Sequence, residues 1–184
     1  SFAPALCNRI DRNTGGIVIA AKNAEALRIL NDKIKGREIE KRYLCLVHGT
    51  PSPSHATRTA YLMKDQVKNR VYLSPTSKPG YKTAVTEYEV LASRAGFSLC
   101  EITLHTGRTH QIRAHMAYLG HPLAGDGKYG KSAQDRQKGF PYQALYSYKL
   151  TFRFRSDAGA LSYLNGKTFT AGHIWFQEIF ENLC

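Results

Sequence analysis

The chain has 184 residues, which is the usual size of one domain and is enough to bury a hydrophobic core. Lysine and arginine number 26 against 14 for aspartate and glutamate, so the net charge is +12 and the pI is about 9.7. This excess predicts a polyanionic partner, nucleic acid rather than a membrane. No apolar run approaches the roughly 20 residues of a spanning helix, and the first residues lack the order of a signal peptide. We therefore expect a cytoplasmic protein.

The cysteine pattern argues against two kinds of site. The cysteines lie far apart in the sequence and form no CxxC pair, which argues against a zinc ribbon and against a dithiol redox site. They are Cys7, Cys45, Cys100 and Cys184. We expect reduced thiols that mostly fill the core, and no metal site.

The first third of the chain predicts a turn, a strand and a helix. Residues 11–16 are rich in turn formers, and the apolar, β-branched run 16–22 predicts a strand that is buried on both faces. Asn23 is a good N-cap, and the apolar spacing that follows predicts a helix from residue 24 to about Gly36.

The remainder alternates mostly between strands and loops. Residues 106–120 change to helical spacing, and 125–142 form a polar, glycine-rich loop. Strands are predicted at 41–47, 57–65, 69–74, 82–92, 97–104 and 144–155. Many strands and few helices predict an α+β fold, with a central mixed, mostly antiparallel sheet flanked by helices, in one domain over 1–184.

Two segments are denser in functional residue types than a core or a plain loop requires. Asn8-Arg-Ile-Asp-Arg-Asn-Thr-Gly-Gly16 and Gly107-Arg-Thr-His-Gln-Ile-Arg113 resemble the HRLDxxTSG and GRTHQIR motifs of the RluA-type RNA pseudouridine synthases. The blocks Lys41-Arg-Tyr43 and Leu119-Gly-His-Pro-Leu-Ala-Gly-Asp126 also match, in the same order. The resemblance implies the fold of that family's catalytic domain and the cofactor-free isomerisation of uridine to pseudouridine in RNA.

The resemblance also assigns roles to single residues. Asp11 corresponds to the catalytic aspartate, Arg113 to the arginine that pairs with it, and Tyr43 to the tyrosine that packs against the target uracil. Arg9 corresponds to the arginine that fills the space left when the uracil turns out of the RNA. The residues expected to bind substrate are Arg9, Arg12, Thr14, Gly107, Arg108, Thr109, His110 and Gln111.

Basic residues elsewhere in the chain form a group of candidates for phosphate contacts, with no one member singled out. The group consists of Lys33, Lys35, Arg37, Lys64, Lys68, Arg70, Lys128, Lys131 and Arg136.

The sequence departs from the family pattern in three ways. Asn8 stands where the family usually has His, and Gly15 where it has Ser. The family domain normally begins several strands before the catalytic motif, so the chain is expected to be truncated at its N-terminus and to lack both those strands and an S4-like RNA-binding domain.

Three functions from different classes are compatible with these features. The first is an isomerase acting on ribosomal RNA, with transfer RNA as the lesser possibility, in a monomeric protein. The second is a catalytically inactive RNA-binding module with the same fold; the retention of Asp11, Tyr43 and Arg113 together argues against it. The third is a nucleoside hydrolase, a chemistry that generally employs two carboxylates where the match supplies one.

Overall fold

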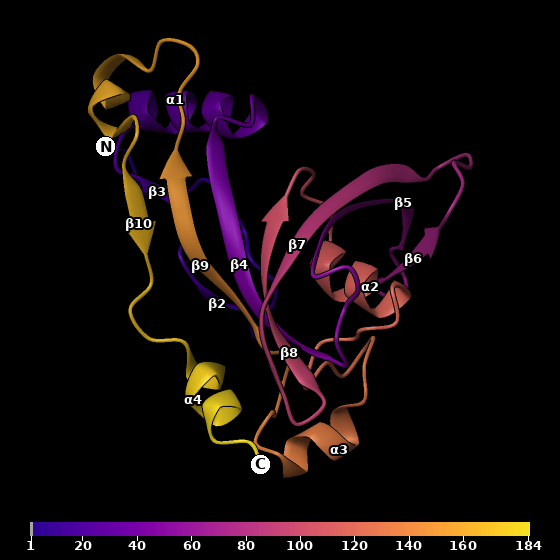
Figure 1. Cartoon of the computed structure of the whole chain (residues 1–184). Helices are drawn as coiled ribbons and strands as arrows, with labels where there is room; N and C mark the ends of the chain where they lie inside the picture. The colour runs from indigo at the N-terminus through magenta and orange to yellow at the C-terminus, as the bar shows by residue number, and fades with distance from the viewer. Residues whose placement is uncertain (1) are drawn as a thin grey trace.

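The computed structural model describes residues 2–184, and one large sheet organises them (Figure 1). No helix in this part of the chain is long and apolar enough to span a bilayer. The strands are β1 Ala5–Leu6, β2 Gly15–Gly16, β3 Ala20–Ala21, β4 Ile39–His48, β5 His55–Asp65, β6 Arg70–Ser74, β7 Lys82–Arg94, β8 Phe97–Leu104, β9 Leu145–Phe152 and β10 Thr168–Thr170. The helices are α1 Ala24–Lys35, α2 Gln111–Tyr118, α3 Ser132–Gln137 and α4 Trp175–Glu181, with a 3₁₀ helix at Gly159–Leu164.

The main sheet has eight strands, of which seven follow the order β10-β9-β4-β8-β7-β5-β6 and pair antiparallel, while β2 pairs with β9 in parallel. β1 and β3 form a separate two-stranded ribbon. This arrangement confirms the predicted α+β fold with a mostly antiparallel sheet. The predicted strands from 41 to 104 and at 144–155 agree with β4 to β9 within a few residues.

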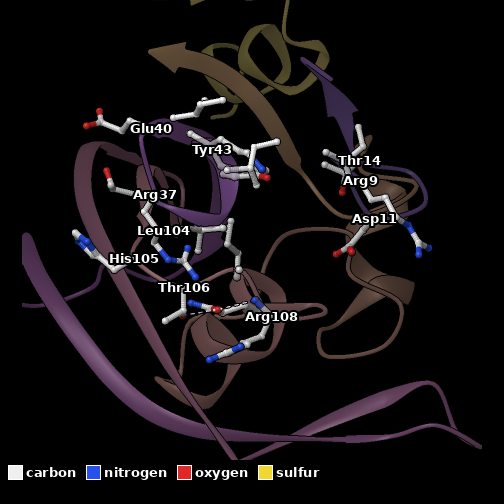
Figure 2. A pocket seen from close by; sticks show the side chains of 18 of the residues that line it. Arg9, Asp11, Thr14, Arg37, Glu40, Tyr43, Leu104, His105, Thr106 and Arg108 are labelled. Carbon is white, nitrogen blue, oxygen red and sulfur yellow. Dashed lines mark hydrogen bonds between the residues drawn. The ribbon is translucent and has the colours of Figure 1, made fainter. Parts of the chain in front are cut away.

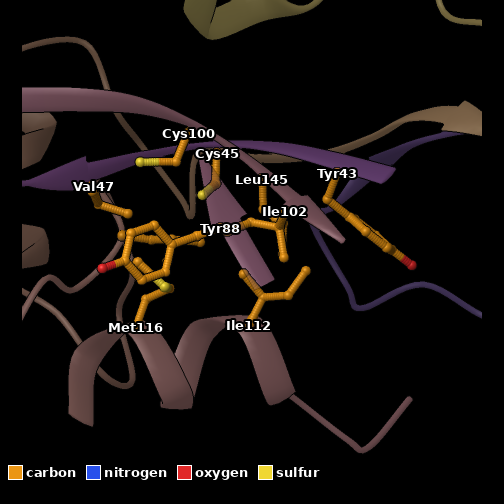
Figure 3. Packing of buried hydrophobic residues seen from close by; sticks show 10 residues of the cluster. Tyr43, Cys45, Val47, Tyr88, Cys100, Ile102, Ile112, Met116 and Leu145 are labelled. Atoms are coloured by element: carbon orange, nitrogen blue, oxygen red, sulfur yellow. The ribbon is translucent and has the colours of Figure 1, made fainter. Parts of the chain in front are cut away.

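Helix α2 lies where the sheet bends from β7 and β8 toward the β5–β6 hairpin (Figure 1). One of its faces packs Ile112 and Met116 against Tyr43, Cys45 and other side chains of β4 and β8 (Figure 3). Another face packs Ala114 against the hairpin. The short helix is thereby held on two sides, which fixes the direction in which its polar residues point.

Two further apolar clusters hold the ends of the sheet. Leu30 of α1 packs against Ile39, Leu150 and Phe152 at one end, and aromatic side chains of α4 pack against Phe140 at the other. The Asn23 side chain accepts a hydrogen bond of 2.8 Å from the Ala26 amide, as predicted for the N-cap of α1.

The predicted buried strand at 16–22 is wrong. Within this run only the two-residue strands β2, which pairs with β9, and β3, which pairs with β1, are present. Val18 lies between them in the sequence and is 42% exposed. Gly16 has φ of 121°, so the chain leaves the extended conformation where it meets β9. A Cβ atom at Gly16 would lie 2.1 Å from the Ser147 carbonyl oxygen, so this close approach requires glycine.

The cysteine prediction is confirmed for the two central positions. Cys45 and Cys100 are fully buried opposite each other on β4 and β8, and all four cysteines are free thiols.

Candidate active site

A cleft of about 650 Å³ opens between the N-terminal turn, β4 and the loop that connects β8 to α2. Figure 2 shows Asp11, Tyr43 and Arg108 around this opening, each from a different part of the chain. Residues from both motifs therefore meet in one place although they are far apart in the sequence.

Asp11 lies in a tight turn that the rest of the protein holds from several sides. The Thr14 amide donates to the Asp11 carbonyl at 3.0 Å, and the Gln143 side chain donates to the Arg12 carbonyl at 2.6 Å. On the far side of the turn, β2 pairs with β9 at Tyr146 and Ser147. These contacts fix the backbone and leave the Asp11 side chain 27% exposed at the cleft.

Tyr43 comes from β4 beside a bulge in the pairing of β4 with β9. Bulges change the direction of neighbouring side chains and are frequent next to active sites. Burial raises the pKa of the Tyr43 phenol, and the nearby Asp11 carboxylate raises it further. Tyr43 therefore keeps its hydroxyl proton at neutral pH.

Arg113 lies in the first turn of α2, behind Asp11 rather than in the lining of the cleft. Its Nη1 atom is 3.9 Å from the Asp11 carboxylate, a loose ion pair. Its short contacts go to Asp126, with Nε to Oδ2 at 2.6 Å and Nη2 to Oδ1 at 3.1 Å. Burial alone would lower the pKa of Arg113, because it disfavours the charged guanidinium. The hydrogen-bonded Asp126 carboxylate has the larger effect, so the pKa of Arg113 is raised.

The loop from 105 to 110 is shaped by the side chain of Gln111, which is buried. Its Oε1 atom accepts from the Thr106 hydroxyl and the Arg108 amide, and its Nε2 atom donates to Val85 and Thr86. Gln111 was predicted to bind substrate, yet its amide is fully used within the protein. The side chain therefore holds the loop in its conformation. Gln111 also lines the cleft, and its contact with substrate stays a prediction.

His110 precedes α2 in a left-handed conformation, with φ of 51°. Its Nδ1 atom lies 2.9 Å from the Tyr129 hydroxyl. Burial lowers the pKa of His110, and the Arg113 charge lowers it further against the opposing effect of Asp11. The imidazole beside the cleft is thus neutral at physiological pH.

The other predicted binding residues divide into two groups. Arg9, Thr14, Gly107 and Arg108 line the cleft, although the Thr14 hydroxyl is buried and accepts from Gln143. Arg12 and Thr109 are exposed outside its lining.

One cation predicted to contact phosphate is not available for it. Lys33 is 2% exposed, and its Nζ atom lies 3.1 Å from Glu38 and donates to both oxygens of Ser156. The prediction for Lys33 is therefore wrong, because the residues after β9 fold back over this face of α1.

The cleft contains features that the motifs did not single out. Lys41 lines it close to Tyr43, and burial lowers the pKa of its amine, as does Arg37. Glu40 is a second carboxylate in the lining, but Arg42 and Arg153 hold it at 2.7 and 3.0 Å. Asp11 is therefore the carboxylate of this cleft that has no short ion pair within residues 2–184.

No group of three or more His, Cys, Asp or Glu side chains in the described part of the chain is arranged to hold a metal ion. The predicted absence of a metal or cofactor stays a prediction.

With the fold and the cleft described, comparison with known proteins identifies the family of the chain. The RNA pseudouridylate synthase family matches residues 1–118, and the chain belongs to this family. The "Uncharacterized RNA pseudouridine synthase YlyB" of Bacillus subtilis is 40% identical over 149 residues, covering 81% of this chain and 47% of the relative. "Ribosomal large subunit pseudouridine synthase D" of Borreliella burgdorferi is 36% identical over 147 residues, covering 80% and 44%.

Among solved structures, "Human RNA Pseudouridylate Synthase Domain Containing 4" superposes with a TM-score of 0.75 at 20% identity, over 96% of this chain and 74% of that one. This likeness concerns the fold. The chain spans about half the length of the curated relatives that it matches.

Proposed function

We propose that the chain is the catalytic domain of an RNA pseudouridine synthase in which Asp11 attacks the target uridine. The observation that carries the proposal is the meeting of Asp11 and Tyr43 in one cleft, with Arg113 directly behind the Asp11 carboxylate. The family resemblance implies catalytic roles for these three residues, and they come from three separate segments.

The reaction needs few groups. The bond from N1 to C1′ breaks, the uracil turns, and a bond from C5 to C1′ forms. The C5 proton leaves to solvent and N1 takes up a proton, so the composition of the nucleoside does not change. Asp11 acts either as a nucleophile at the sugar or the base, or as the base that removes the C2′ proton. Tyr43, which keeps its proton, packs against the uracil and donates a hydrogen bond to it. Arg113 keeps Asp11 ionised when the flipped base excludes water from the cleft.

The charge around the cleft supports RNA as the substrate. Six cations of the lining form no ion pair with a carboxylate among residues 2–184, and this uncompensated positive charge would attract a phosphate backbone. They are Arg9, Lys35, Arg37, Lys41, Arg108 and Arg155. Arg9 is exposed at the rim of the cleft, where it fills the space that the target uracil leaves in the RNA stack. Because relatives are named for the large ribosomal subunit, ribosomal RNA is the substrate we propose.

Tritium release tests the proposal, because the hydrogen at C5 leaves the base only if the isomerisation takes place. Ribosomal RNA labelled with [5-³H]uridine is incubated with the wild-type chain, with Asp11→Asn and with Asp32→Asn. The last is a matched control, since Asp32 is an exposed carboxylate on α1. We expect release by the wild type and the control, and none by Asp11→Asn.

Two results would contradict the proposal. Release by Asp11→Asn at the wild-type rate would remove Asp11 from the chemistry. RNA binding without any release by the wild type would favour an RNA-binding module with the same fold.

A further inference from the structure

The main partner of Arg113 is a residue to which no role has been assigned. Asp126 is completely buried and holds Arg113 through two hydrogen bonds of 2.6 and 3.1 Å. Its Oδ1 atom also accepts from the amides of Lys128 and Tyr129, at 2.8 and 2.9 Å. A carboxylate that accepts four such hydrogen bonds is held in one orientation, so it holds the guanidinium in one position.

Tyr129 holds the same guanidinium on its flat face. The Arg113 Cζ atom lies 5.4 Å from the centre of the Tyr129 ring. The Tyr129 hydroxyl is itself fixed, because it accepts from the Val71 amide at 2.9 Å and lies 2.9 Å from His110 Nδ1. The turn from Asp126 to Tyr129 therefore determines both the position and the plane of the Arg113 head group.

This arrangement controls how Arg113 meets Asp11. Asp126 occupies Nε and Nη2, and Nη1 is the nitrogen that faces Asp11, at 3.9 Å. Within residues 2–184 the Asp11 side chain accepts no hydrogen bond. An arginine free of Asp126 would be able to turn and engage Asp11 with two nitrogens, which would cover the carboxylate that has to attack.

On the basis of the proposed function, we propose that Asp126 is a positioning residue for the isomerisation. It holds Arg113 close enough to keep Asp11 ionised and prevents the two from closing into a bidentate pair. The Asp11 carboxylate thereby remains available to the uridine.

The experiment compares Asp126→Asn with a matched control. Asparagine retains an acceptor for the two turn amides and removes the charge that holds Arg113. The control is Glu38→Gln, which also removes a buried carboxylate that pairs with one cation, Lys33, and accepts from two backbone amides. The values of kcat and KM for tritium release are measured at a temperature at which circular dichroism shows both variants to be folded.

If Asp126 positions Arg113, kcat of Asp126→Asn falls on the order of 100-fold, since small displacements of catalytic groups have effects of this size. KM stays within about twofold, because RNA binding does not depend on this residue. Glu38→Gln keeps the wild-type kcat. A wild-type kcat in Asp126→Asn, or a loss that appears in KM alone, would overturn the proposal.

A second measurement does not depend on activity. The Nε–H signal of Arg113 in the NMR spectrum is assigned by its loss in Arg113→Lys. It is expected to shift and to exchange faster with water in Asp126→Asn, but not in Glu38→Gln. An unchanged signal would refute the positioning role. A changed signal in a protein whose wild type releases no tritium would support the contact and reject the proposed function.

Should Asp126→Asn fail to fold, Asp126→Glu replaces it, because it keeps the charge and moves it by one methylene group. The expected result is again a lower kcat at an unchanged KM. Full activity with an unchanged Nε–H signal would overturn the proposal.

Discussion

Replacing Arg113 by Met is expected to lower the free energy of unfolding by about 3–5 kcal/mol, the usual effect of breaking a buried ion pair from one side. Met fills most of the space of the arginine stem and leaves the Asp126 carboxylate without its cation. Oδ1 of Asp126 keeps the hydrogen bonds from the Lys128 and Tyr129 amides, whereas Oδ2 loses its 2.6 Å bond. The loss thus arises from one uncompensated charge at a site with no solvent exposure.

The pH dependence separates this cause from a simple loss of packing. In the wild type, burial alone would raise the pKa of Asp126, but Arg113 and the two amides outweigh burial and lower it. In the wild type the ionised pair therefore stabilises the folded state fully above the unfolded pKa of about 3.9. This stabilisation is lost only as the pH falls through the lower pKa of the folded state. In Arg113→Met the cation no longer opposes burial, so Asp126 takes up a proton at a higher pH in the folded state. The stability gap between the two proteins should therefore narrow as the pH falls.

Urea unfolding followed by circular dichroism at pH 7.5 and pH 5.0 measures this gap. The double variant Arg113→Met/Asp126→Asn, in which both charges are absent, is expected to regain about 2 kcal/mol relative to Arg113→Met. A gap below about 1 kcal/mol, or an equal gap at the two pH values, would refute the reasoning.

Three further changes test other parts of the molecule. Burial lowers the pKa of His115 to about 4, so the wild type should lose up to about 3 kcal/mol of stability as the pH falls from 6.5 to 4. His115→Gln should reduce this pH dependence in urea unfolding. Asn23→Ala removes the cap of α1 and should lower the free energy of unfolding by about 1 kcal/mol; an unchanged urea midpoint would contradict this. Lys41→Gln removes a cation from the cleft, so the slope of log Kd for single-stranded RNA against log salt, measured by fluorescence anisotropy, should fall by about 0.7.

The strands were predictable because their patterns are local. The run 97–104 has the length and composition of a strand, and β8 occupies those residues. The failure at 16–22 has a different cause, because an apolar run does not reveal that Gly16 turns away from the sheet. Helix α2 begins only at Gln111, since the Gln111 side chain bonds to Thr106 and Arg108 and keeps the residues before it in a loop.

The candidate site was predictable as far as its residues lie in short motifs. The structure brings Asp11 and Tyr43 to one cleft, as the resemblance implied. The role of Asp126 was not predictable, although its sequence block was noted, because it depends on how the loop after α2 folds back onto Arg113. The burial of Lys33 likewise depends on Ser156, which is 123 residues away.

The turn that carries Asp11 has a consequence for the order in which the chain folds. Its supports come from Gln143, which is 131 residues from Arg12 in the chain, and from Tyr146 and Ser147 of β9. A ribosome synthesises Asp11 long before it reaches those residues, and contacts of such separation form late because closing a long loop is entropically costly. The Asp11 carboxylate is therefore synthesised early and fixed in position late. A nascent chain can fold most of β4 to β8 before the turn that holds Asp11 has its supporting contacts.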